Sequence, residues 1–211
     1  MTLCSDPPAC NGAPYRKRYG YRLVSPATGD VGQPAAGRRD LRLSSGRRHR
    51  YRSCMVDFPF ECTVDPVAPR KQEVRALLEA LTDELASGGY ASDQTFGYSA
   101  EQLEQSGVHL VGARVAGSLV GIAGIEVQRA GLGELKRFFV RPEQRGTGVA
   151  DALVAVLLVY AEACQVRLVR LETGDKQHAA QAFYRRHGFV HVPRFGPYVN
   201  SETSVCMQRP V

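Results

Sequence analysis

The chain has 211 residues, 44% of them hydrophobic, and a formal net charge of +6 at pH 7. Its length allows one buried core with residues left over, because single domains usually run to about 100 to 150 residues. The charge is uneven: the first 54 residues hold 11 Lys and Arg against 3 acidic residues, a net of +8, so the remainder carries −2. This mildly acidic remainder argues against a nucleic-acid partner for the folded part.

Composition also disfavours a membrane protein and a metal centre. No apolar run approaches the ~20 residues that span a bilayer, and the N-terminus lacks the apolar stretch of a secretory signal. The six cysteines are scattered, with no Cys-x-x-Cys pair and no histidine at ligand spacing. We therefore expect a soluble cytoplasmic protein with free thiols and no metal.

Residues 1–54 are rich in Pro, Gly, Ser and Arg and show no apolar periodicity. Such a segment cannot bury enough surface to offset its ordering entropy, so we predict a disordered basic tail. Its basic run at residues 47–52 could bind nucleic acid, although a solvated run is the commoner case. Met55 lies where the globular pattern begins, so a wrongly assigned start is an alternative explanation of the tail. Residues 55–211 form the predicted domain.

The first half of this domain predicts one strand, two helices and a hairpin. After a strand-like stretch at 58–64, five apolar residues share one helical face over 70–87, and Gly88-Gly89 ends the helix. Ser99 and Gln102 resemble a capping box that opens a short helix ended by Gly107. Strands at 108–115 and 118–128 should pair antiparallel around a tight turn at Ala116-Gly117.

The second half alternates strands and helices. A strand at 134–140 leads through a glycine-bearing loop into an apolar helix at 148–163, which should be largely buried. A strand at 167–173, a helix at 178–187 closed by Gly188, and two strands at 190–192 and 204–208 follow. This order predicts a mixed α/β layered domain.

The loop with Gly146 and Gly148 lies between a strand and a helix N-terminus. Unpaired backbone N–H groups and the positive end of the helix dipole meet there, which favours phosphate binding, and Arg145 adds a charge at the rim. Two glycines before a helix are common, so this pattern alone is weak evidence. The dinucleotide fingerprint is not satisfied, because no third glycine is in register and the preceding strands look antiparallel.

Three motifs in order give a stronger signal. The segment 145–150 (Arg-Gly-Thr-Gly-Val-Ala) resembles the coenzyme A signature of the GNAT acetyltransferase superfamily. The strand 134–140 with Arg141-Pro142-Glu143 looks like the family's fourth strand, and 180–184 followed by Gly188-Phe189 looks like its late-helix motif. The resemblance covers about 150 residues. It implies an α/β fold with a mixed, mostly antiparallel central sheet flanked by helices, in which the fourth and fifth strands splay apart.

The resemblance also implies how acetyl-CoA is bound. The backbone of Phe138, Phe139 and Val140 should pair with the pantetheine amides and polarise the thioester carbonyl. The diphosphate should lie on the loop formed by Arg145, Gly146, Thr147, Gly148, Val149 and Ala150. Gln177 stands where the family usually has Asn, which puts a side-chain contact to the pantetheine arm in doubt.

Two residues match catalytic positions of the family. Glu134 matches a glutamate that accepts the amine proton directly or through water, although a strand-end Glu is more often a solvated charge and many relatives use a water chain. Tyr184 matches the tyrosine that protonates the departing thiolate; its alternative reading is a core aromatic beside Phe183. Glu172, His178 and His187 are weaker candidates.

The predicted function is transfer of an acetyl group from acetyl-CoA to a primary amine, without a metal. The acceptor is expected to be a small molecule, and residues 194–198 resemble a loop that borders the acceptor pocket in some bacterial relatives. The alternatives are a non-catalytic acyl-CoA-binding regulatory module and an acetyltransferase that acts on a protein amine. The net charge of −2 argues against a nucleic-acid-associated acceptor. Assembly as a homodimer is compatible with the sequence.

Overall fold

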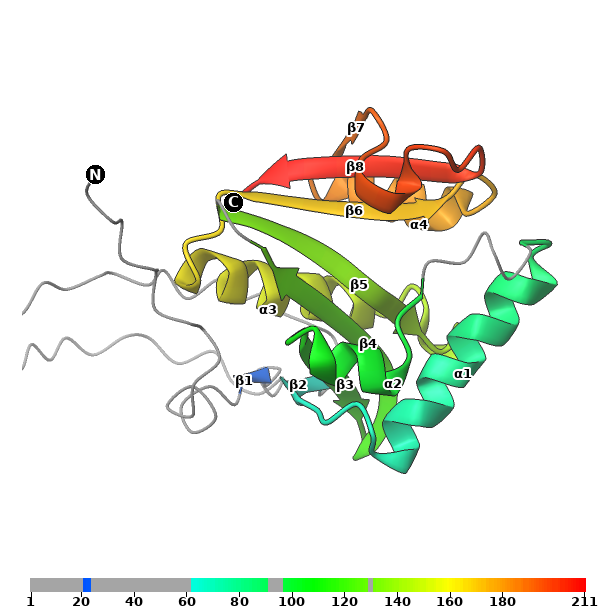
Figure 1. Ribbon diagram of the computed structural model, residues 1–211. Helices are drawn as coiled ribbons and strands as arrows, with labels where there is room; N and C mark the ends of the chain where they lie inside the picture. The colour runs from blue at the N-terminus through cyan, green and yellow to red at the C-terminus, as the bar shows by residue number, and fades with distance from the viewer. Residues whose placement is uncertain (1–20, 24–61, 91–96, 129–130) are drawn as a thin grey trace, which may run out of the picture.

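A computed structural model describes residues 21–23, 62–90, 97–128 and 131–211. Within these residues, eight strands form one sheet in the order β1-β2-β3-β4-β5-β6-β8-β7 (Figure 1). The strand bounds are Tyr21–Leu23 (β1), Cys62–Pro66 (β2), His109–Val115 (β3), Ser118–Val127 (β4), Leu132–Val140 (β5), Leu168–Gly174 (β6), Val190–Val192 (β7) and Ser204–Pro210 (β8). Every neighbouring pair is antiparallel except β5 and β6, which run parallel.

Helices cover both faces of the sheet. Their bounds are Gln72–Ser87 (α1), Ala100–Gln105 (α2), Val149–Ala163 (α3) and His178–Arg186 (α4), with 3₁₀ turns at Pro142–Gln144 (η4) and Gly196–Tyr198 (η5). One core packs α1 and α2 onto Ile122 and Phe139, and the other packs α3 onto Val111, Ile125 and their neighbours. Because α3 is buried along most of its length, its sequence is apolar nearly all round, as predicted.

Several local predictions are confirmed in detail. Ser99 caps α2 in a capping box with Gln102, so two backbone donors at this helix end are satisfied reciprocally. Ala116 and Gly117 both have positive φ, 48° and 80°, as a tight hairpin turn between antiparallel strands requires. Gly89 has φ 80° directly beyond the end of α1.

The N-terminal part of the chain differs from the prediction. The strand expected at 58–64 is β2, which begins at Cys62 and continues to Pro66, while 58–61 lie outside the described residues. Tyr21–Leu23 was expected within the tail but pairs antiparallel with β2. Three residues are too short a stretch for alternation to predict a strand. The rest of the predicted tail lies outside the described residues.

The strands β5 and β6 part after a short paired segment, which confirms the expected splay. They pair only from Leu132–Leu168 to Glu134–Arg170, and Figure 1 shows them diverging toward α1 and α4. On its other side β5 carries a bulge, because Lys136 is paired with Gly124 whereas Phe139 is paired with Ile122. Arg137, inside the bulge, has φ 53°. The bulge and the splay together shape the candidate site.

Candidate active site

The loop before α3 and the first residues of this helix present a group of backbone N–H donors. Gly146 has φ 76° and Gly148, the N-cap residue, has φ 97°, so both adopt the left-handed conformation that favours glycine. Among the residues that the structure describes, no acceptor is found for the backbone N–H groups from Gly146 through Ala150. Thr147 holds the turn by donating its hydroxyl to the Gln144 carbonyl at 2.8 Å. This arrangement suits an anion such as a diphosphate.

Arg145 is tied down beside this loop. Its Nε donates to the Val140 carbonyl at 3.0 Å, and its Nη2 forms an ion pair with Glu84 of α1 at 2.5 Å. The sequence predicted a charge at the rim of the phosphate loop. The structure adds a second task, because Arg145 fastens the loop to both β5 and α1.

The edge of β5 that faces β6 provides backbone groups for a ligand. Beyond Glu134, β5 and β6 are no longer paired. In the described part of the chain, no strand therefore lies along this edge of the segment that contains Phe138, Phe139 and Val140. An extended arm with amide groups could pair with it as an additional strand does. The edge ends at the loop before α3, so an arm on β5 and a diphosphate on α3 would be continuous.

Gln177 has a local role that the sequence did not predict. Its side-chain oxygen accepts hydrogen bonds from the Thr173 hydroxyl at 2.7 Å and from the Gly174 backbone N–H at 3.4 Å. It stands at the N-cap position of α4. The side-chain oxygen therefore closes the turn between β6 and α4.

Tyr184 lies in the aromatic core beside the β5 bulge. It is 7% exposed, and its ring makes edge contacts with Phe138, Phe183 and Phe189 at centroid distances of 6.0, 5.3 and 5.6 Å. Within the described residues no hydrogen-bond partner is found for its hydroxyl. Burial and then the charge of Glu172 raise the pKa of Tyr184, which keeps the hydroxyl protonated.

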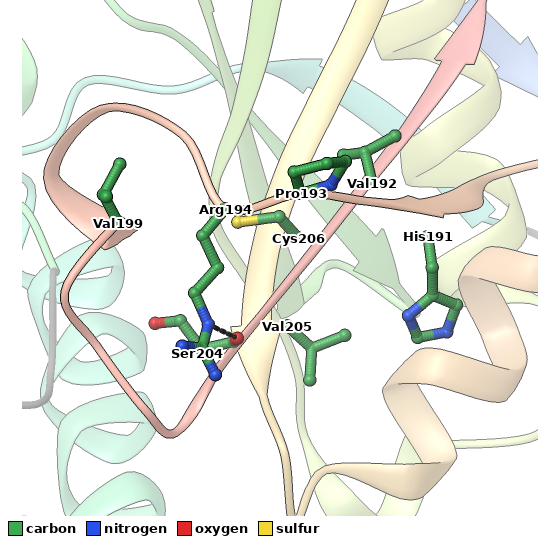
Figure 2. A pocket seen from close by; sticks show the side chains of 8 residues that line it. All are labelled: His191, Val192, Pro193, Arg194, Val199, Ser204, Val205 and Cys206. Atoms are coloured by element: carbon green, nitrogen blue, oxygen red, sulfur yellow. Dashed lines mark hydrogen bonds between the residues drawn. The ribbon is translucent and has the colours of Figure 1, made fainter.

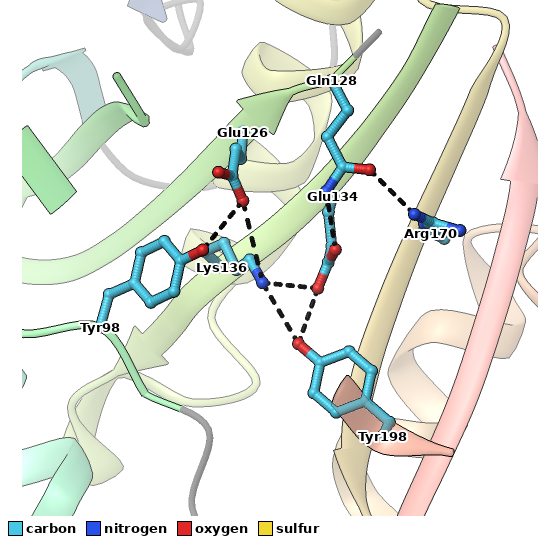
Figure 3. A network of polar contacts seen from close by, with 7 residues as sticks. All are labelled: Tyr98, Glu126, Gln128, Glu134, Lys136, Arg170 and Tyr198. Carbon is cyan, nitrogen blue, oxygen red and sulfur yellow. Dashed lines mark hydrogen bonds and ion pairs between the residues drawn. The ribbon is translucent and has the colours of Figure 1, made fainter. Parts of the chain in front are cut away.

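Glu134 is buried in a network of donors rather than exposed (Figure 3). Its Oε1 accepts hydrogen bonds from Lys136 Nζ at 2.6 Å and Tyr198 Oη at 2.7 Å, and its Oε2 accepts one from Gln128 Nε2 at 3.1 Å. At 3% exposure, the reading of Glu134 as a solvated surface charge is wrong. Three donors, one of them an ammonium, therefore occupy lone pairs on both oxygens of this carboxylate.

Lys136 lies at the centre of the same network. Its ammonium is 3.9 Å from Glu126 and 4.9 Å from the centroid of the Tyr98 ring, and the Tyr98 hydroxyl donates to Glu126. Tyr98 precedes α2 and Tyr198 belongs to η5, so segments far apart in the sequence meet on this face of the sheet. Burial and then the Glu134 charge raise the pKa of Tyr198, so this hydroxyl also stays protonated.

Glu172 of β6 is a carboxylate whose environment the sequence did not reveal. Its Oε1 accepts a hydrogen bond from Ser204 Oγ at 2.7 Å, and no donor to its Oε2 is found in the described residues. Burial is the main cause that raises its pKa, and the nearby charge of Glu134 adds to the effect. Glu172 lies beyond Arg170, the last residue of β6 that pairs with β5, so it stands where these two strands have separated, while it remains paired with Cys206 of β8.

The two histidine candidates do not join this cluster. His187 forms an ion-pair contact with Asp151 at 2.8 Å, which links the end of α4 to the first turn of α3. His178 is exposed at the start of α4. Among the described residues, neither imidazole makes a hydrogen bond, ion pair or ring contact with Glu134, Glu172 or the Tyr184 ring, although the backbone N–H of His187 donates to the Tyr184 carbonyl at 3.0 Å.

A cavity of about 510 Å³ lies along β7 and β8 (Figure 2). Arg194, from the loop that resembles an acceptor border, lines it together with Val199 and Cys206. Ser204, which donates to Glu172, forms part of the same wall. The cavity therefore adjoins Glu172 through Ser204, and no residue of the glycine loop before α3 lines it.

Among the described residues, none of the helices has the length and apolar content that a membrane span needs, and no group of three or more His, Cys, Asp or Glu side chains is placed to hold a metal ion. Cys62 and Cys206 are buried free thiols.

A splayed α/β sheet, with a donor-lined helix N-terminus at one end of the gap and acidic and phenolic groups along it, defines the class of acyl-CoA-dependent transferases. The model of the Acetyltransferase (GNAT) family matches residues 72–189. The chain is 30% identical over 150 residues to an IAA acetyltransferase of Azospirillum brasilense, a match that covers 71% of this chain and 97% of the relative. The chain belongs to the GNAT acetyltransferase family.

Solved structures agree with this membership. A Klebsiella pneumoniae protein assigned to the acyl-CoA N-acyltransferases is 32% identical, with a TM-score of 0.60 over 71% of this chain and 97% of that one. A PaiA N-acetyltransferase from Thermoplasma acidophilum, solved with coenzyme A, has a TM-score of 0.59 over 72% and 100% of the two chains. At 16% identity, the second likeness concerns the fold alone.

Proposed function

We propose that this acyltransferase moves the acetyl group of acetyl-CoA to the primary amine of a small molecule. The observation that carries the proposal is the continuity between the free edge of β5 and the unpaired N–H groups before α3. A pantetheine arm along Phe138 to Val140 and a diphosphate on Arg145 to Ala150 would use both. The positive φ of Gly146 and Gly148 lets the backbone approach the diphosphate closely.

Each step of the transfer has a candidate residue. Acetyl-CoA supplies an acyl carbon activated as a thioester. As the amine nitrogen bonds to that carbon, a carboxylate must remove a proton from the nitrogen; Glu172, with one oxygen free of donors, is better suited than Glu134. The carbon–sulfur bond then breaks, and Tyr184 donates its proton to the thiolate. Backbone N–H groups of β5 would stabilise the oxyanion.

A small acceptor is favoured over a protein amine because Glu134 and Tyr198 are buried. Glu134 and Tyr198 are 3% and 2% exposed, so the groups that would surround the amine lie below the surface. The relative from Azospirillum brasilense is named for acetylation of IAA, which is a statement about that protein.

The test is release of free coenzyme A thiol from acetyl-CoA with a panel of amines. Amine-dependent release, with the acetylated amine identified by mass spectrometry, is the expected result. Binding of acetyl-CoA without release, for every amine and for a lysine-containing peptide, would support a regulatory acyl-CoA-binding module instead.

A further inference from the structure

The bulge in β5 places two consecutive cationic side chains on the same face of the sheet. In a regular strand, neighbouring side chains point to opposite faces. Here Lys136 reaches Glu126 and Tyr98, while Arg137 donates to the Leu78 carbonyl and the Thr82 hydroxyl of α1. Both therefore lie on the face that α1 and α2 cover, beside the backbone of Phe138.

The two cations differ in how their charge is compensated. Lys136 has Glu134 at 2.6 Å and Glu126 at 3.9 Å. Arg137 has no carboxylate within ion-pair distance among the described residues, and its two hydrogen bonds are long, 3.4 Å to Leu78 O and 3.2 Å to Thr82 Oγ1. Its Nε is buried without a hydrogen-bond partner.

Keeping this guanidinium in place is unfavourable for the ligand-free protein. Arg137 is partly buried, and a cation without a counter-ion that is partly buried loses hydration without recovering it; desolvation is the cause that lowers the pKa of Arg137. The backbone is strained as well, since φ is 53° at a residue other than glycine. An anion beside the guanidinium would relieve the electrostatic part of this cost.

The Arg137 guanidinium occupies space that is open because residue 97 is a glycine. A Cβ built on Gly97 would lie 2.0 Å from Arg137 Nη1. The conformation of Gly97 does not call for glycine, because no positive φ is found there. The requirement at Gly97 is therefore for room beside Arg137.

We propose that Arg137 binds a carboxylate of the acceptor, so that the substrates are amino acids or other amines that carry a carboxylate near the amine. This inference rests on the proposed acetyl transfer. The coenzyme diphosphate has its own donors at the N-terminus of α3, which leaves the acceptor as the source of the anion. Arg137 would then be a specificity-determining residue, with its guanidinium next to the strand that polarises the thioester.

Matched pairs of acceptors test this directly. Phenylalanine is compared with phenethylamine, and leucine with isoamylamine, in the wild type, Arg137→Met and Gly97→Ala. We expect kcat/KM to favour the carboxylate-bearing member at least tenfold in the wild type and the preference to shrink to about twofold or less in both variants. Gly97→Ala moves only the flexible tip of Arg137, so it should fold normally. The control is Arg114→Met, which removes an arginine paired with Glu73 and should keep the preference.

Stability and binding give readouts that do not depend on turnover. Arg137→Met removes a partly buried, uncompensated charge, so its Tm should equal or exceed that of the wild type. With coenzyme A present, N-acetylphenylalanine should raise the Tm of the wild type more than N-acetylphenethylamine does, and this difference should vanish in Arg137→Met.

Three results would overturn the inference. They are equal kcat/KM for both members of each pair in a wild type that is active, a Tm of Arg137→Met several degrees below the wild type, and a tenfold or greater loss of acetyl-CoA affinity in Arg137→Met. The second would make Arg137 a structural clamp on α1, and the third would assign the anion to the coenzyme. Absence of turnover with every amine would count against the proposed function, and the thermal shifts would then decide the role of Arg137.

Discussion

Two carboxylates on neighbouring strands, Glu134 and Glu172, share a face of the sheet but differ in their bonding. Glu134 is held by an ammonium, a phenol and an amide, whereas Glu172 has a single hydroxyl donor. A general base needs free lone pairs and a pKa near the working pH, and burial raises the pKa of Glu172 toward that range. The same residue type thus has donors on both carboxylate oxygens in one position and an oxygen without a donor, among the described residues, in the other.

This contrast predicts opposite phenotypes for two conservative substitutions. Glu172→Gln should lower kcat by ~10²–10⁴-fold with little change in Tm, because it removes the proton acceptor. Glu134→Gln should mainly lower stability, by about 3 kcal/mol, because it leaves Lys136 buried with a weaker partner. Steady-state kinetics across pH and thermal unfolding of both variants check this. If the decrease of kcat/KM at low pH disappears in Glu134→Gln and persists in Glu172→Gln, Glu134 is the base.

Tyr184→Phe is predicted to lower turnover by ~10²–10⁴-fold while acetyl-CoA affinity changes by about 1 kcal/mol or less. The substitution keeps the ring and its contacts with Phe138, Phe183 and Phe189. Because burial raises the pKa of Tyr184 above that of an ordinary tyrosine, no high-pH limb from this residue should appear up to pH ~9. Turnover within a few-fold of wild type would make Tyr184 a core aromatic only.

At the scale of elements, the strand β5 and the helix α3 act as one unit. Arg145 donates to the last carbonyl of β5 and pairs with Glu84 of α1, and the turn between strand and helix depends on two glycines with positive φ. The position of the helix N-terminus relative to the strand edge is therefore fixed by short-range contacts. An extended ligand could engage both without a change of backbone.

Gly148→Asp should weaken acetyl-CoA binding at least tenfold, about 1.4 kcal/mol, since it adds bulk and like charge at the anion site. Part of any effect could come from backbone strain, because φ is 97° at this position. The matched control is Gly117→Asp, which has φ 80° and open space around its Cβ at the hairpin turn between β3 and β4. Calorimetry measures the acetyl-CoA affinity of both variants and so separates backbone strain from the added charge. If Gly148→Asp binds acetyl-CoA as tightly as Gly117→Asp, Gly148 is not part of the coenzyme site.

At the scale of the whole molecule, a partly buried histidine couples stability to pH. His109 of β3 stacks on Tyr160 of α3 with a centroid distance of 3.8 Å, and burial lowers the pKa of His109 to about 4. In the unfolded chain a histidine titrates near ~6.5, so between these values the unfolded state binds more protons. The histidine thus favours the fold above pH ~6.5, and this stability is lost as pH falls toward 4.

The free energy of unfolding should therefore fall by up to about 3 kcal/mol between pH 6.5 and 4 on account of His109. His109→Phe keeps a ring against Tyr160 but cannot titrate, so its stability should vary less with pH over this window. Urea unfolding of both proteins at several pH values measures the difference. If the free energy of unfolding of His109→Phe changes with pH as that of the wild type does, His109 is not the titrating group. His191 is exposed, so the same substitution at His191 is the control and should keep the pH dependence of the wild type.

Removing residues 1–54 should leave the domain folded and able to bind acetyl-CoA. The deletion takes away β1, whose three residues pair with β2, but β2 keeps its five-residue pairing with β3. Every motif of the site lies beyond residue 54. We expect a decrease in Tm of a few degrees at most and an unchanged acetyl-CoA affinity; a large drop would show that this part of the chain is structural.

The sequence alone determined the features that depend on local chemistry. The capping box of α2, the hairpin turn at Ala116-Gly117, the apolar helix α3 and the glycine loop before it all follow from residues within a few positions of one another. Three motifs in order were enough to predict the family and the splayed sheet.

Only the tertiary structure distinguished the roles of the charged residues. Glu134, Glu172 and Arg137 have no sequence pattern that shows which carboxylate is neutralised, which oxygen is free, or which guanidinium lacks a counter-ion. Those properties depend on partners far along the chain, such as Tyr198 for Glu134, Ser204 for Glu172 and Gly97 for Arg137. The physical reason is that ionisation and desolvation depend on neighbours in space, whereas caps and turns depend on neighbours in sequence.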